Sequence, residues 1–226
     1  YHRLRELAPV HRSGTGTIFL TRFDDCNEVL RDNRFGNGDS NEGLGLPSAD
    51  PATDAFRRDQ RRRMADRPQS LLFLDPPDHT RQRRLVSRAF TPRRVEKMRG
   101  TIAELARRHV DDLAEAGEGD LLDLVGFPFP VSVIGALVGV PEADWPRFRS
   151  LITRGAVGIE PTASIEELRD GEQANTETWE YFVDLVAERR ARPQDDLLSD
   201  LIRVEEEGDQ LSEAEVIVVA ILIFAA

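Results

Sequence analysis

Apolar side chains recur every three or four residues along most of the chain, and this spacing predicts a mainly helical protein. Between residues 95 and 113 they form one continuous helix face, which Gly117 ends. Similar patterns continue towards the C-terminus. We expect helices over about 92–116, 131–138, 142–157, 165–190 and 195–205.

The first 31 residues predict shorter elements around a small β-sheet. A helix over residues 1–8 is stopped by Pro9, and residues 24–31 form another short helix. Between them, Val10–Arg12 and Thr17–Thr21 read as strands joined by a turn of serine, threonine and glycine. The expected fold class is therefore mainly α with a small β-sheet.

Residues 35–73 show no clear period and predict a long loop. Glycine, asparagine, aspartate, serine and proline dominate its first part, and the arginine-rich run Arg57–Arg63 follows. A loop of this length in a compact domain is usually functional or mobile. The arginines could meet nucleic acid or an acidic partner, but we expect a solvated, mobile loop.

The final segment, residues 212–226, predicts a helix that is buried on every side. Ser212 and Glu215 have the spacing of a capping box, and every residue after Glu215 is apolar. Neither glycine nor a polar residue ends this helix. A chain terminus inside a buried helix would desolvate its carboxylate, so we expect the sequence to stop within a longer helix.

Composition and charge narrow the class of protein. Hydrophobic residues make up 40% of the chain, no apolar run reaches the ~18 residues that cross a bilayer, and no signal segment opens it. The net charge of −11 is uneven, because residues 1–100 hold 20 basic and 14 acidic side chains. We expect a cytoplasmic protein that binds neither membranes nor nucleic acid.

His79 and Arg83 form the candidate binding pair of the sequence. Asp75 and the two prolines after it predict the start of a helix over residues 76–90. Four residues apart, the two side chains share one helix face and offer hydrogen-bond donors to carboxylates. An isolated pair of this kind is common on solvated helices, so its surroundings decide the interpretation.

Those surroundings resemble the helix-C region of bacterial cytochromes P450. The resemblance rests on Phe73-Leu74-Asp75-Pro76-Pro77-Asp78-His79-Thr80-Arg81-Gln82-Arg83-Arg84-Leu85-Val86-Ser87-Arg88-Ala89-Phe90-Thr91-Pro92. Segments 19–35, 127–141, 195–201 and 211–226 resemble other parts of the same family, in the same order along the chain. The resemblance identifies the chain as the N-terminal part of a single P450 domain that stops within the long central helix I.

The resemblance also implies site residues. His79 and Arg83 match the pair that binds the propionates of haem b, and Ala225 or Ala226 matches the small residue over the haem. Leu71, Leu72 and Leu222 match positions at the substrate pocket, although ordinary core packing explains each about equally well. The cysteine that ligates iron in this family lies beyond residue 226, so we expect no metal ligand and no complete catalytic set in this chain. Cys26, on the face of Val29 and Leu30, is expected to be an ordinary core residue.

The implied function of the whole protein is that of a monooxygenase. It would oxidise a small organic substrate with O2 and electrons from a ferredoxin, which could dock near Arg81, Arg84 and Arg88. Two other interpretations stay open at this point. One is a non-enzymatic haem-binding or inert helical fragment, and the other, which the sequence favours less, is a helical ligand-sensing regulator.

Overall fold

The chain folds into ten α-helices and one β-hairpin within the residues that the computed structural model describes, which are 1–14, 16–37, 50–160, 162–206 and 210–225. The N-terminal elements are α1 (His2–Leu7), β1 (Val10–Arg12), β2 (Ile18–Leu20), α2 (Phe23–Arg31) and α3 (Pro51–Arg63). The remaining helices are α4 (Asp78–Ala89), α5 (Pro92–Ala116), α6 (Pro128–Val138), α7 (Trp145–Ala156), α8 (Ile165–Ala191), α9 (Leu197–Glu206) and α10 (Glu213–Ala225). The expected class, mainly α with a small sheet, is confirmed.

Short turns of other helix types connect these elements. They are the 3-10 turns η2 (Leu71–Phe73), η4 (Glu142–Asp144) and η5 (Val157–Ile159), and the π-turn η3 (Leu122–Gly126). No helix in the described part of the chain is long and apolar enough to cross a bilayer.

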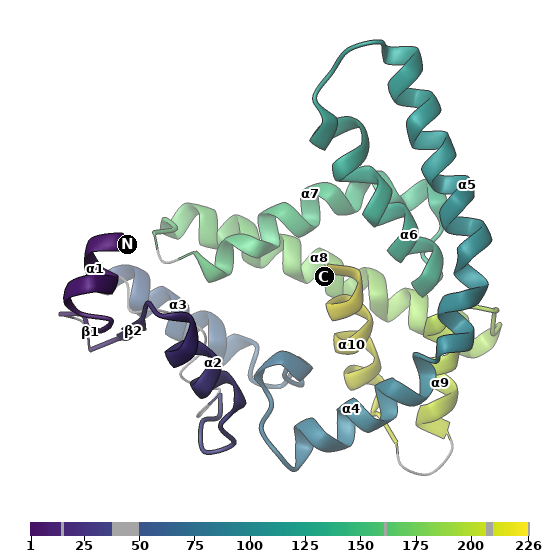
Figure 1. Ribbon diagram of the computed structural model, residues 1–226. Helices are drawn as coiled ribbons and strands as arrows, with labels where there is room; N and C mark the ends of the chain where they lie inside the picture. The colour runs from purple at the N-terminus through teal and green to yellow at the C-terminus, as the bar shows by residue number, and fades with distance from the viewer. Residues whose placement is uncertain (15, 38–49, 161, 207–209, 226) are drawn as a thin grey trace.

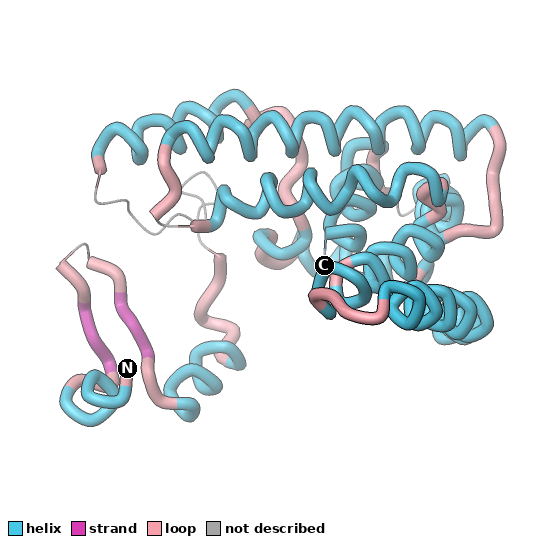
Figure 2. Tube along the Cα trace, turned by 90° about the horizontal axis from the view of Figure 1, so that it is seen from above, coloured by secondary structure: helices cyan, strands magenta, loops and turns pink. Residues whose placement is uncertain are grey.

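The N-terminal hairpin stands to one side of the helical part (Figure 2). β1 and β2 pair antiparallel, with Val10 opposite Leu20 and Arg12 opposite Ile18. Neither α1 nor α2 contains a buried residue, and Leu30 is 85% exposed. The expected inward face of Cys26, Val29 and Leu30 is therefore wrong for Leu30, while Cys26 is half-buried.

The hydrophobic core lies among α4 and α6–α10. Leu85, Phe148, Phe182, Val216 and Phe224 are among its buried members. α10 stands in the middle of Figure 1, where it packs against α6, α8 and α9. The core thus forms around the last helix of the chain.

The expected loop over residues 35–73 is wrong for 51–63, where α3 forms. Asp50 accepts hydrogen bonds from the backbone N–H groups of Ala52 and Thr53, and Pro51 occupies the first turn. Arg57 is buried and donates to the carbonyl of Glu160. α3 contains too few apolar residues to show a helical period in the sequence. Its packing against α8 is a tertiary contact that the local sequence does not indicate. Residues 38–49 lie outside the described residues.

Candidate functional site

The helix α4 has one buried side, and polar side chains lie along both edges of that side. Gln82, Leu85 and Ala89 face the interior, and His79 is half-buried beside them on the same helix. Arg83, one turn after His79, is exposed. The two candidate residues therefore share one edge of α4, as their spacing predicts.

The start of α4 differs from the sequence expectation. Its first position is preceded by Pro77, which provides no side-chain cap. The Asp75 carboxylate instead accepts the backbone N–H of Asn37 at 2.9 Å. Gly36 allows this contact, because a Cβ at that position would lie within 3 Å of the same carboxylate. Asp75 thus ties the segment after α2 to the start of α4.

The other edge of α4 is fixed to the start of α10. Arg81 forms an ion pair with Glu215 and donates to the carbonyl of Gln210 at 2.8 Å. The Nε2 of Gln82 donates to Glu215 Oε1 at 3.0 Å. The expected capping box is present as well, since Ser212 and Glu215 exchange hydrogen bonds of 2.7 and 3.3 Å. Arg81 is thereby engaged within the chain and is not a free surface arginine.

Glu215 is the electrostatic centre of this joint. Burial by itself would raise the pKa of its carboxyl group. The backbone N–H of Ser212 and the charge of Arg81 outweigh that effect, so the pKa is lowered from its ordinary value. Glu215 is therefore an ionised anchor that holds α4 and α10 together.

The donors of His79 and Arg83 have no such anchor. Neither side chain forms a hydrogen bond or ion pair with any residue in the described ranges. Arg81, two residues before Arg83, is engaged by Glu215 and Gln210, so His79 and Arg83 differ from it in having no side-chain partner among the described residues. This edge of α4 therefore carries an imidazole and a guanidinium whose donors have no partner among the described residues.

α10 contributes an apolar face that is only partly covered. Val216, Val219, Ala220 and Phe224 are buried, whereas a stripe on the opposite side is half-buried or exposed. Its members are Ala214, Val218, Ile221, Leu222 and Ala225. Among the described residues, burial is therefore complete on one side of α10 and incomplete on this stripe. Leu222 and Ala225, both selected from the sequence, lie one turn apart on it.

The remaining candidate residues are Leu71, Leu72 and Ala226. Leu71 and Leu72 lie in η2, which packs against α4. Leu71 is half-buried and Leu72 is 60% exposed. Ala226 lies outside the described residues. The structure thus brings His79 next to Arg83 and Leu222 next to Ala225, and puts η2 beside α4, but the roles of all seven residues stay predictions.

Sequence reasoning missed Gln82 and Glu215 as the residues that join the two helices. Gln82 precedes Leu85 by three residues and Ala89 by seven, so the helical period already put it on the buried face. A buried amide requires a polar partner, which Glu215 provides. The identity of that partner, 133 residues away, has no signal in the sequence.

Comparison with known proteins finds similarity to cytochromes P450. No family model matches the chain. Cytochrome P450 107B1 of Saccharopolyspora erythraea is 35% identical over 233 residues, which cover all of this chain and 54% of that protein. Mycinamicin IV hydroxylase/epoxidase of Micromonospora griseorubida is 36% identical over 234 residues, covering 100% of this chain and 53% of the relative.

Solved structures agree with these relatives. P450BioI, in complex with an acyl carrier protein that carries hexadec-9Z-enoic acid, matches with a TM-score of 0.80 and 27% identity, over 100% of this chain and 56% of that one. Ligand-free cytochrome P450 TbtJ1 matches with a TM-score of 0.75 and 32% identity, over 99% and 53%. The chain spans about half the length of the curated relatives it matches.

Proposed function

We propose that this chain, a cytochrome P450 homologue over its whole length in sequence and in fold, is the N-terminal half of a haem-dependent monooxygenase. The order of the matching segments supports the N-terminal position. The protein would oxidise a small organic substrate with O2, as the name of the relative mycinamicin IV hydroxylase/epoxidase describes for that enzyme. Electrons would come from a ferredoxin-type partner.

One observation carries this proposal. Two donor side chains, His79 and Arg83, lie without a partner on α4, while α10 presents an apolar stripe that its neighbours leave half-covered. Haem combines a flat apolar ring with two carboxylates, and both parts find a complement here. Buried carboxylates need such donors, because an unpaired charge is costly away from water. The donor set therefore fits haem.

Each candidate site residue would have its own role in holding haem or substrate. His79 and Arg83 would hold the propionates, since a guanidinium and an imidazole donate to carboxylates with favourable geometry. The short side chains of Ala225 and Ala226 would leave room for the ring. Leu222, Leu71 and Leu72 would add apolar surface for the substrate and exclude water from it. The haem, when bound, supplies the chemistry of dioxygen activation.

No residue of this chain is proposed as the iron ligand. Cys26 lies on α2, and its Sγ is 3.6 Å from the carbonyl of Leu20. α2 belongs to the N-terminal part, and it lies away from α10 in Figure 1. We therefore expect the ligand cysteine elsewhere in the whole protein, and we expect Cys26→Ser to leave the thiolate-type haem spectrum unchanged.

The redox partner and the cytoplasmic location stay predictions. Arg88 is exposed on α4 and forms no bond within the described residues, so it remains available to an acidic protein surface. Arg81 is committed to Glu215, which removes it from the expected docking group. Arg84 is exposed but has interactions within the chain.

The test is haem retention in the whole protein. His79→Ala combined with Arg83→Ala removes both donors, and we expect haem to transfer to apomyoglobin at least about tenfold faster. Arg88→Ala removes one positive charge from another face of α4 and should leave the rate within about twofold. Equal rates in the double variant and the parent protein would overturn the proposed role and favour an inert or differently liganded helical protein.

A further inference from the structure

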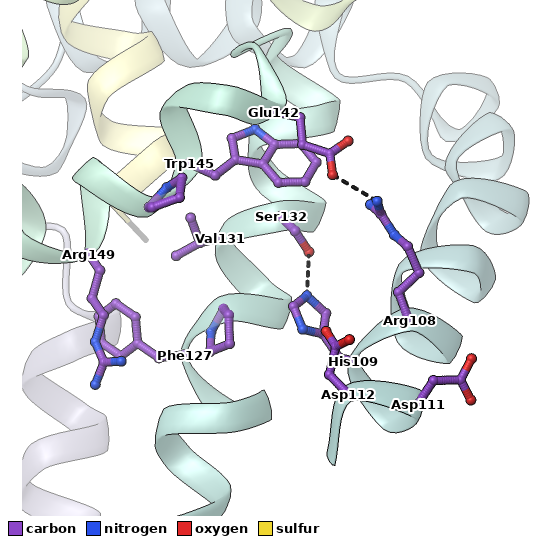
Figure 3. A pocket seen from close by; sticks show the side chains of 12 residues that line it. Arg108, His109, Asp111, Asp112, Phe127, Val131, Ser132, Glu142, Trp145 and Arg149 are labelled. Carbon is purple, nitrogen blue, oxygen red and sulfur yellow. Dashed lines mark hydrogen bonds and ion pairs between the residues drawn. The ribbon is translucent and has the colours of Figure 1, made fainter. Parts of the chain in front are cut away.

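A groove of about 630 Å³ lies between α5, the start of α6 and the start of α7 (Figure 3). Its lining includes Arg108, His109, Asp112, Val131, Trp145 and Arg149. His79 and Arg83 on α4 and Leu222 and Ala225 on α10, together called the α4–α10 face, do not line it. Its volume is within the range of small-molecule sites.

The walls of the groove are apolar around a fixed indole ring. Trp145 donates its Nε1–H to the carbonyl of Val140 at 2.9 Å, so the polar atom of the ring is already satisfied. The ring is half-buried, and the side chain of Val131 lies close to it in the groove (Figure 3). The part of Trp145 that remains available is therefore a π-surface, which attracts organic cations.

The positive side chains of the groove are already neutralised. Arg108 donates to Glu142 at 2.7 Å (Figure 3). Arg149 forms an ion pair with Asp123, and its guanidinium lies 5.0 Å above the ring of Phe127. An anionic ligand would have to displace one of these acidic partners.

Two acidic side chains, in contrast, have no counter-ion. Asp111 and Asp112 are exposed and form no hydrogen bond or ion pair within the described part of the chain. Asp112 lies beside His109 on the groove side of α5, whereas Asp111 points away (Figure 3). The uncompensated charge of the groove is therefore negative, with Asp112 as its nearest source.

In its neutral form, His109 has one ring nitrogen that can accept a hydrogen bond. Its Nε2 is 3.4 Å from Ser132 Oγ, and that hydroxyl donates its single hydrogen to the carbonyl of Phe129 at 2.7 Å. The contact therefore requires the hydrogen on Nε2, which leaves Nδ1 with a lone pair. With that tautomer, Nδ1 can accept a hydrogen bond from a ligand that carries an N–H group.

We propose that this groove binds an organic ammonium ion with a hydrophobic body. The body lies against Trp145 and Val131, and the cationic head is stabilised by the indole face and by Asp112. Such a site is separate from the α4–α10 face, so it is a second ligand site of the protein. Cation–π contacts with the half-buried indole and the nearby carboxylate together favour the cation over a neutral compound of the same shape.

The probe is benzyltrimethylammonium, measured by isothermal titration calorimetry on the whole haem protein. Its nitrogen has no lone pair, so it does not ligate iron, and the Soret band recorded in the same titration reports any entry into the haem pocket. We expect saturable binding with one ion per protein and no Soret shift. Benzyl alcohol should bind at least about fivefold more weakly, and phenylacetate not measurably.

Variants identify the site. Asp112→Asn should weaken binding of the probe about three- to fivefold, and Trp145→Leu by a similar factor or more. Asp111→Asn removes the same charge one residue away and should weaken binding less than Asp112→Asn. No saturable binding, equal affinity for phenylacetate, or unchanged affinity in both Asp112→Asn and Trp145→Leu would overturn the proposal.

Discussion

Arginines in two regions of this molecule have opposite surroundings. Arg189, near the end of α8, is 3% exposed and donates to Asp196 at 2.6 Å and to the carbonyl of Gly139. Asp196 in turn accepts the backbone N–H of Ser199 at 2.8 Å. Arg83 on α4 is exposed, and with His79 it has no partner among the described residues.

The difference separates a structural role from a binding role. The contacts of Arg189 close a joint between α6, α8 and the start of α9, so its donors are used by the fold itself. The donors of His79 and Arg83 are directed to nothing inside the described chain. A donor that is engaged contributes to stability, whereas a donor without a partner in the fold is available to a ligand.

Removing the engaged arginine should give the largest loss of stability. Arg189→Ala leaves the Asp196 carboxylate buried without its counter-ion, which costs about 3–5 kcal/mol. Equilibrium urea unfolding of the protein measures this free energy. Arg107→Ala is the matched control, because Arg107 forms an exposed ion pair with Glu104 and should cost less than about 1 kcal/mol. A similar small effect for both variants would show that the Arg189 joint does not hold the helices together.

Glu215, which joins α4 to α10, should give an intermediate effect that depends on pH. Because the pKa of its carboxyl group is lowered in the folded state, the ionised form stabilises the fold. This contribution is complete well above the ordinary value of 4.5 and is lost as the pH falls through the lowered pKa. We expect Glu215→Gln to cost about 1–2 kcal/mol at pH 7 and to reduce the loss of stability on acidification.

The control for this prediction is Glu213→Gln in the same helix turn. Glu213 forms only a long, exposed contact of 3.4 Å with Arg190. Its replacement should change the unfolding free energy by less than about 0.5 kcal/mol at pH 7. If Glu213→Gln and Glu215→Gln showed the same pH dependence, the link between α4 and α10 would not depend on the Glu215 carboxylate.

The helices could be predicted from the sequence wherever one face is apolar and a cap is present. Thr91 caps α5 by accepting the backbone N–H of Arg94, and Ser164 and Glu167 form a capping box at α8. α3 was missed because its interior is dominated by arginines, and its contact with α8 has no local pattern. Periodicity reports the burial of a face, and it does not detect helices that are held by polar side chains.

The candidate site could be predicted only in part for a similar reason. The spacing of His79 and Arg83 placed both on one edge of α4, and the structure agrees. The apolar run of α10 predicted burial all round, but the side of Val218 and Leu222 is only half-covered. Sequence hydrophobicity indicates that a side chain avoids water without identifying what covers it, and a ligand covers it as well as another helix does.

The smallest change in stability is expected for the variant that lacks both His79 and Arg83, and it tests the contrast with Arg189 directly. His79→Ala combined with Arg83→Ala should change the unfolding free energy of the haem-free protein by less than about 0.5 kcal/mol, because neither side chain bonds within the described chain. The same double variant should destabilise the haem-bound protein by more, since a ligand that binds the folded state adds stability according to its affinity. Urea unfolding with and without haem measures both values. A large loss already present without haem would mean that the two donors serve the fold, and the contrast with Arg189 would disappear.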